Sequence, residues 1–281
     1  MPISTEYLPA AYALSAVGVW GASDFLGGIG ARRVNAFLFT AIVHISGMVL
    51  MGGLTLFVQA PLPGNASLRW ALLAGSVGGI ALALFYRALA SGKMGLTAPI
   101  AAILGAGVPT IVSAFAQCFP GYRHMSGFVL AGIGVWLISR TEDGAGRPEG
   151  LGMAVLAGIG FAGFYLCITQ AGNASALWIA LISRTASFVV TSAFVLFGRH
   201  IRAAPTPVLA IAILTGCLDI TGSAVFIRAV QTGRLDEAVV LSSLYPAITV
   251  LLARIFLHEH FSRARTVGML AALLAVPMVA G

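Results

Sequence analysis

The sequence contains very little charge. Only 9% of its 281 residues are Asp, Glu, Lys or Arg, whereas 59% are hydrophobic and the mean hydropathy is +0.97. Soluble domains carry about 25% charged residues, so this chain cannot cover itself with a water-compatible surface. The composition excludes a soluble protein and predicts a polytopic membrane protein.

Cysteine is scarce as well. Cys118, Cys167 and Cys217 lie in apolar segments and lack the spacing of a disulfide framework or a metal site. The basic residues outnumber the acidic ones, 16 to 9, but they occur singly or in pairs between apolar runs. They do not form the clustered patch with aromatics of a nucleic-acid interface. We therefore expect no metal, no cofactor and no nucleic-acid partner.

Motifs of soluble enzymes are missing or misplaced. Gly158–Gly163 has the spelling of a dinucleotide fingerprint, but it lies inside an apolar run with no strand before it. Ser91-Gly92-Lys93 lacks the upstream glycine of a phosphate-binding loop, so ATP is not the expected energy source. His258-Glu259-His260 has no histidine pair four residues apart, and we interpret it as an interfacial loop. We expect no catalytic residues. The alternative outside transport is an integral-membrane enzyme. Only His258, Glu259 and His260 come near to a set of catalytic residues.

Long apolar runs follow one another along the whole chain. A run of about 20 apolar residues crosses a bilayer as a helix, and we count ten candidates. The first run has no basic residue before it, so we expect a permanent span and not a cleaved signal peptide. The sequence predicts an all-α polytopic membrane protein with ten transmembrane helices. The expected spans are Leu8–Ile29, Val34–Val58, Leu68–Ala90, Leu96–Phe119, Met125–Ser139, Leu151–Thr169, Ala174–Phe197, Val208–Val230, Ala238–Leu257 and Thr266–Ala280.

The second half of the chain repeats the first. The segment Arg87–Lys93 returns as Arg228–Arg234, and Gly75 has its counterpart in Gly216. Residues 140–150 concentrate charge, glycine and proline, as a linker does. We expect one five-helix repeat over residues 1–139 and a second over 151–281. Because five is an odd number, the second repeat enters the membrane in the opposite direction, which gives inverted repeats around a central site.

The loop charges predict an orientation. Cytoplasmic loops of membrane proteins carry an excess of Lys and Arg. The more basic side should then face the cytoplasm, with both termini outside and the protein in the cytoplasmic membrane. One side carries Arg32, Arg33, Lys93, Arg140, Arg147, Arg199, Arg202, Arg263 and Arg265, and the other carries only Arg69, Arg123 and Arg234.

A few ionisable residues fall inside the expected spans. Charges within a membrane are costly and usually face a protein interior or a water-filled path. Arg184 and Asp219 lie near the middle of consecutive spans, either as a structural ion pair or as groups that bind substrate or a coupling proton. In the repeat, His44 stands opposite Arg184 and Gly78 opposite Asp219. Asp24 lies near the inner end of the first span, where a functional role and a snorkelling surface role are both open.

Aromatic side chains are candidates for the walls of a site. Trp20 lies 12 residues into its span, too deep for an interfacial aromatic belt. Tyr86, Tyr165 and Tyr245 add rings from other spans. Each ring alone fits packing as well as ligand contact, but together they suit an amphipathic or aromatic solute.

Two prolines lie inside spans at matching positions of the repeat. Pro109 and Pro246 each remove a backbone donor, and the freed carbonyl must find another partner in the membrane. They are either kinks that shape the bundle or paired hinges beside the site. Ser242 and Ser243 supply hydroxyls next to the second proline.

The whole pattern resembles the EamA family of drug/metabolite transporters. The residues that carry the resemblance are Trp20-Gly21 with Ser23, Arg87-Ala88-Leu89, Tyr245-Pro246, Glu259 and Gly268. The resemblance implies export of small metabolites, often amino acids and in some members aromatic ones, by alternating access without ATP. The chain departs from the pattern in two places. Gly121-Tyr122-Arg123 stands where the first repeat would match Glu259, and His44 stands where an arginine would match Arg184.

The sequence therefore predicts a secondary transporter that exports small metabolites, amino acids first among them, from a site at the membrane midplane. The alternative within transport is a proton-coupled multidrug or cation exporter, with Asp24 or Asp219 as the exchanging acid. The expected partners are a small-molecule substrate and the lipid bilayer, and a monomer is compatible with the sequence. The residues expected to bind substrate are Trp20, Tyr86, Tyr165, Asp219, Ser242, Ser243 and Tyr245.

Overall fold

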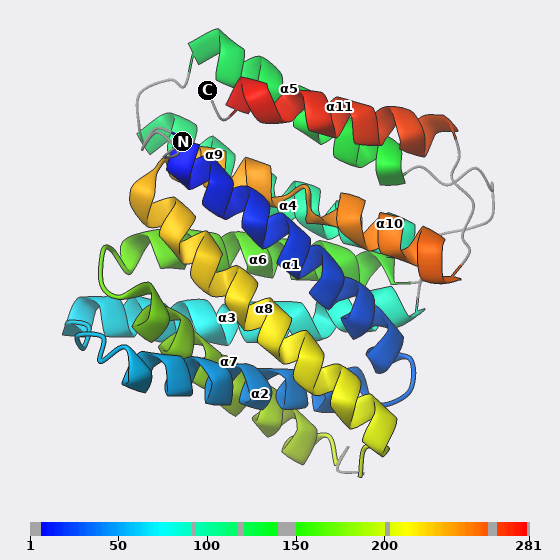
Figure 1. Cartoon of the computed structure of the whole chain (residues 1–281). Coiled ribbons are helices and arrows are strands. Elements are labelled where there is room, and N and C mark those ends of the chain that lie inside the picture. Colours follow the sequence, from blue (N-terminus) through cyan, green and yellow to red (C-terminus); the bar gives the residue numbers. More distant parts are fainter. Residues whose placement is uncertain are drawn as a thin grey trace.

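The computed structural model describes residues 7–91, 94–116, 121–139, 150–199, 203–257 and 263–279. Within these ranges the regular structure is helical throughout, and the helices pack into one bundle (Figure 1). Their bounds are α1 Leu8–Ala31, α2 Ala36–Phe57, α3 Asn65–Ser91, α4 Met94–Ala116, α5 Gly121–Ser139, α6 Leu151–Gln170, α7 Ala176–Phe197, α8 Thr206–Thr232, α9 Leu235–Ser242, α10 Tyr245–Leu257 and α11 Arg263–Val279.

A helix lies in each range where a span is expected, except that the ninth range holds two, α9 and α10. In the described part of the chain, six helical stretches are long and apolar enough to cross a membrane. The all-helical, multi-pass membrane class is thus confirmed, while ten spans and two inverted repeats stay predictions. The expected linker falls on residues 140–149, which lie outside the described ranges. The six stretches are Ala36–Phe57, Asn65–Ser91, Leu151–Gln170, Ala176–Phe197, Thr206–Thr232 and Leu235–Leu257.

The two prolines at matching positions have different surroundings. Pro109 lies within an unbroken α4, which also contains Pro99. The chain around Pro246 is divided instead, because α9 ends at Ser242 and α10 begins at Tyr245. At the break the Ser243 N–H donates to the Val239 carbonyl at 2.9 Å. The structure therefore contains one interrupted span where the repeat alone predicts two equivalent kinks.

Small residues let α3 and α7 approach closely. Gly75 and Gly79 of α3 face Ser183 and Ser187 of α7, so that a Cβ added at either glycine would overlap the facing serine. The Ser187 hydroxyl donates to the Gly75 carbonyl at 2.7 Å. Close backbone contact and side-chain hydrogen bonds are the forces that hold helices together in lipid. The close contact of α3 with α7 therefore joins the first half of the chain to the second.

Helices of the two halves interleave throughout the bundle. The helix α1 packs on α8, α3 packs on α6 and α7, and α2 packs on α7 and α8. The helices α5 and α11 pack on each other and lie together at one edge of the bundle (Figure 1). Most of the buried apolar residues form one core cluster shared by both halves. The centre of the bundle is consequently built by residues far apart in the sequence.

Candidate functional site

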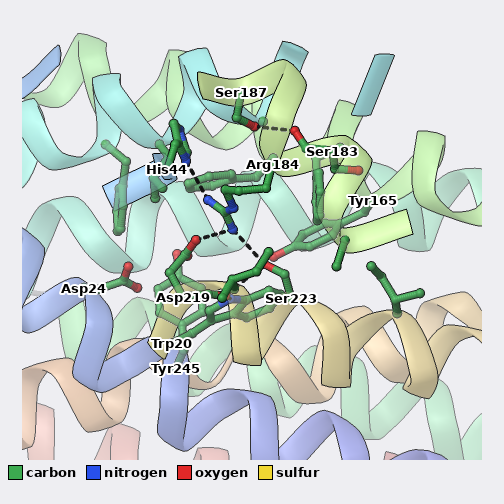
Figure 2. A pocket seen from close by; sticks show the side chains of 18 residues that line it. Trp20, Asp24, His44, Tyr165, Ser183, Arg184, Ser187, Asp219, Ser223 and Tyr245 are labelled. Atoms are coloured by element: carbon green, nitrogen blue, oxygen red, sulfur yellow. Dashed lines mark hydrogen bonds and ion pairs between the residues drawn. The ribbon is translucent and has the colours of Figure 1, made fainter. Parts of the chain in front are cut away.

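A cavity lies at the centre of the bundle, among α1, α2, α3, α6, α7, α8 and α10 (Figure 2). The cavity is open on one side. Its volume is about 670 Å³, which includes the solvent space at the opening. Both halves of the chain contribute to the wall. The lining residues are Trp20, Asp24, His44, Gly78, Leu82, Phe85, Phe161, Phe164, Tyr165, Ala180, Ser183, Arg184, Ser187, Asp219, Ile220, Ser223, Ile227 and Tyr245.

A buried polar network around Arg184 forms one side of the cavity (Figure 2). Arg184 Nη2 lies 2.5 Å from Asp219 Oδ2 and donates to Ser223 Oγ at 3.3 Å. Arg184 Nη1 lies 2.6 Å from His44 Nδ1. Arg184 and Asp219 are each 6% exposed, so water screens this pair little. The network joins α7, α8 and α2 through one guanidinium group.

Asp24 on α1 has a different environment. Its side chain lines the cavity, and the residue is only 5% exposed. Among the residues that the structure describes, none forms a hydrogen bond or an ion pair with its carboxylate (Figure 2). A buried carboxylate without a partner is costly, and it is normally neutralised by a proton or a bound cation. Asp24 is therefore an acidic group of the cavity with which a ligand can pair.

Aromatic rings form another part of the cavity wall. The Trp20 ring lies 6.3 Å from that of Tyr165 and 6.5 Å from that of Tyr245, measured between ring centroids. The Trp20 indole N–H donates to the Asp219 carbonyl at 3.2 Å, and the indole packs against Gly222 of α8. These contacts hold the ring in the cavity wall, where it adds apolar surface that suits an apolar or aromatic group.

The structure brings together several of the residues expected at the site and leaves others apart. Trp20, Tyr165, Asp219 and Tyr245 line the cavity, as do Asp24 and Arg184. Arg184 and Asp219 form the ion pair considered from the sequence, and this pair also faces the cavity.

Three of the expected residues are not among those lining the cavity. The Tyr86 hydroxyl lies 3.3 Å from Ser23 Oγ in the core. The Ser242 hydroxyl donates to the Val239 carbonyl, and that of Ser243 donates to the Val240 carbonyl. Pro109 and Pro246 are also absent from the lining, although Pro246 follows the lining residue Tyr245.

Sequence reasoning missed some of the lining. His44 was identified only as the repeat counterpart of Arg184, yet the two side chains are in contact. Ser183 and Ser187 line the cavity from α7 and were not singled out. Their spacing of four residues matches that of Gly75 and Gly79 on α3, and this pairing of small residues is the signal that locates them.

The described residues contain no group of three or more His, Cys, Asp or Glu side chains that could hold a metal ion. The cluster His258-Glu259-His260, the remaining candidate for an enzymatic site, lies outside the described residues.

Comparison with known proteins shows the fold and a likeness to one family in the second half of the chain. A solved structure titled "Crystal structure of protein" superimposes with a TM-score of 0.74 and 16% identity, over 96% of this chain and 95% of that one. At that identity the likeness shows the fold alone. No curated protein matches the chain. The model of the EamA-like transporter family matches residues 148–281. The second half of the chain is thus similar to the EamA-like transporter family.

Proposed function

We propose that this protein is a secondary transporter that exports small amine-bearing metabolites, amino acids and aromatic ones first among them. The observation that carries the proposal is the central cavity, where the unpartnered carboxylate of Asp24 shares the lining with the rings of Trp20, Tyr165 and Tyr245. The family match supports membrane transport, and the cavity chemistry supports the substrate class.

Each part of an aromatic amino acid has a matching group in the cavity. The substrate ammonium would donate a hydrogen bond to a side-chain oxygen of Asp24, and the substrate side chain would lie against Trp20 and the two tyrosines. The substrate carboxylate would approach Arg184, whose Nε has no hydrogen-bond partner among the described residues. Arginine is suited to this contact because its planar group binds carboxylates in a fixed geometry.

The helix contacts support alternating access by two inverted five-helix repeats. In the expected repeat, α1, α2 and α3 correspond to α6, α7 and α8, α4 corresponds to α9 with α10, and α5 corresponds to α11. The contact of α1 with α8 then has its counterpart in the contact of α6 with α3. The contact of α4 with α6 likewise corresponds to that of α9 and α10 with α1. The pairs α2 with α7 and α5 with α11 correspond to themselves. Such a pattern is expected of two repeats related by a two-fold axis, and rocking of one repeat against the other exposes the site alternately.

A second candidate is an exporter of organic cations. The negative charge of Asp24 inside an aromatic cavity favours it, because aromatic faces attract cations by cation–π interaction. The two candidates differ in whether the substrate needs a carboxylate.

The experiment is a counterflow assay with the purified full chain in liposomes. Vesicles loaded with one unlabelled amino acid are diluted into the same labelled amino acid, and accumulation above protein-free vesicles identifies a substrate. We expect aromatic amino acids to give the largest signal. If no amino acid and no organic cation accumulates, the proposal is wrong.

Two variants connect that transport with the cavity. Trp20→Phe removes the indole donor and part of the aromatic wall, so the KM should rise about tenfold, which corresponds to about 1.4 kcal/mol. Trp70→Phe is the matched control, because Trp70 is 38% exposed and is not among the lining residues. Equal transport by both variants would remove Trp20 from the site.

A further inference from the structure

The charges that line the cavity do not cancel. Asp24 and Asp219 are two acids, and Arg184 is the only Lys or Arg among the lining residues. The guanidinium is 2.5 Å from Asp219, so that pair is neutral. One negative charge, on Asp24, is left over.

His44 does not balance this charge. Arg184 Nη1 lies 2.6 Å from His44 Nδ1, and a guanidinium nitrogen can only donate a hydrogen bond. The imidazole Nδ1 must therefore accept, which requires a neutral ring with its hydrogen on Nε2. Protonation of Nδ1 would break this bond and place two cations in direct contact. The histidine is thus held neutral beside Arg184.

Among the residues that the structure describes, the helices packed against α1 bring no other cation close to Asp24. Asp219 of α8 adds like charge, while Tyr86 of α3 and Tyr245 of α10 present neutral phenols. On α9, the Asp236 carboxylate is already paired with Arg234 at 2.8 Å. No group in the described part of the chain neutralises Asp24, so a proton or a bound cation is the partner that remains.

We propose that a proton and a cationic substrate take turns on Asp24, so that each monovalent cation carried exchanges for one proton. This inference rests on the proposed function. When a cation enters the cavity, the Asp24 proton leaves to water on that side, and when the cation leaves on the other side a proton from water replaces it. The loaded and the empty cavity are then both neutral, and the exchange moves no net charge across the membrane.

The same charge balance predicts that a zwitterion is carried without proton exchange. An amino acid brings its own carboxylate together with its ammonium group, so it leaves the single excess negative charge in place. One proton must then stay in the loaded cavity, as in the empty one. An amino acid therefore crosses without exchanging a proton, whereas an organic cation of similar shape exchanges one.

The test compares L-phenylalanine with phenyltrimethylammonium, whose charge does not change with pH. The full chain is reconstituted into liposomes that contain a pH-sensitive dye, with the membrane potential clamped by potassium and valinomycin. We expect uptake of phenyltrimethylammonium to make the lumen more alkaline, with one proton leaving per cation and no dependence on the potential. Uptake of phenylalanine should leave the luminal pH unchanged.

Variants assign the exchange to Asp24. Asp24→Asn should abolish the proton signal and cation uptake while phenylalanine counterflow persists with a raised KM, and Asp24→Glu should retain the exchange. Glu237→Gln is the matched control, since this acid is not in the lining and should leave both activities unchanged. A proton signal that survives in Asp24→Asn would overturn the assignment.

The wild-type stoichiometry tests the proposal even if no variant folds. Phenylalanine counterflow without any carriage of phenyltrimethylammonium, or cation uptake that leaves the luminal pH unchanged, would overturn the exchange while the transport function stands. Absence of counterflow for both compounds would instead contradict the proposed function itself.

Discussion

The guanidinium of Arg184 contacts the imidazole of His44 across 140 positions of the chain, with 2.6 Å between Nη1 and Nδ1. These residues occupy matching positions on α2 and α7, which pack on each other. Two arginines here would repel at close range in a poorly screened environment. The replacement of one cation by a neutral acceptor turns a repulsive contact into a hydrogen bond.

This contact predicts opposite outcomes for two substitutions of His44. His44→Gln keeps an acceptor for Arg184 and should yield a folded, active transporter. His44→Lys places a second cation in the network and should lower stability by about 3 kcal/mol, as for a broken buried ion pair. Thermal unfolding in detergent, followed by counterflow, measures both effects. A His44→Lys protein as stable as the wild type would show that the pair is not held together in the membrane.

The ion pair of Arg184 and Asp219 should behave as a coupled unit. Arg184→Met or Asp219→Leu alone leaves a buried charge without its partner and should cost about 3–5 kcal/mol. The double variant should cost clearly less than the sum of the two, because both charges are gone. Unfolding free energies of the four proteins form the double-mutant cycle. Strict additivity would mean that the two side chains act independently.

The close approach of α3 and α7 should make Gly75 intolerant of a side chain. A Cβ at this position overlaps the backbone of Ser183, so Gly75→Ala must push the helices apart and should cost about 1–3 kcal/mol. Gly53→Ala on α2 is the control, since no atom lies within 4 Å of its added Cβ. The comparison of their melting temperatures tests the packing, and equal values would contradict it.

Gly222 should control the orientation of Trp20. An added Cβ would lie 2.6 Å from Trp20 Cδ1, so Gly222→Ala must displace the indole and break its hydrogen bond to the Asp219 carbonyl. We expect a KM for the transported amino acid raised about tenfold, or about 1.4 kcal/mol. Gly18→Ala on α1, where the added Cβ meets nothing within 4 Å, should leave the KM as it is. Unchanged kinetics in Gly222→Ala would show that the ring position does not matter for binding.

Orientation is tested by labelling single cysteines introduced into a cysteine-free protein. A cysteine at Asn35, between α1 and α2, should react only from the cytoplasmic side. A cysteine at Gly64, between α2 and α3, should react from the outside. The excess of Lys and Arg on the expected cytoplasmic side is the physical reason. The reverse labelling pattern, or a cytoplasmic signal from a reporter fused at Gly281, would contradict the prediction that both termini lie outside the cytoplasm.

Hydropathy predicted the helices, and the cost of charge in lipid singled out Asp219 and Asp24, although a surface role stayed open for Asp24. Both follow from strong energies: apolar runs avoid water, and groups such as Asp24 or Asp219 are too costly in lipid to point outward. The direction in which a polar side chain points within its helix is a weaker signal. Ser242 and Ser243 were expected at the site from their depth, but their hydroxyls bond to carbonyls of their own helix.

The break between α9 and α10 was not predictable from the prolines alone, because Pro109 and Pro246 match in the repeat. The difference lies one turn before each proline. Ser242 and Ser243 offer hydroxyls that compete for the carbonyls of the preceding turn, whereas Gly105 and Ala106 offer none. The two proline turns therefore differ in local hydrogen bonding as well as in helix continuity.

The break between α9 and α10 is a point at which α10 can tilt relative to α9. Beyond it, Thr249 of α10 donates its hydroxyl to the Gly21 carbonyl of α1 at 3.1 Å, and Gly21 lies about one helical turn from Asp24. A tilt of α10 at this break would displace α1 through this hydrogen bond, while α9 stays packed against α4. If such a tilt opens one end of the cavity, movement and ionisation would act on the same short stretch of α1.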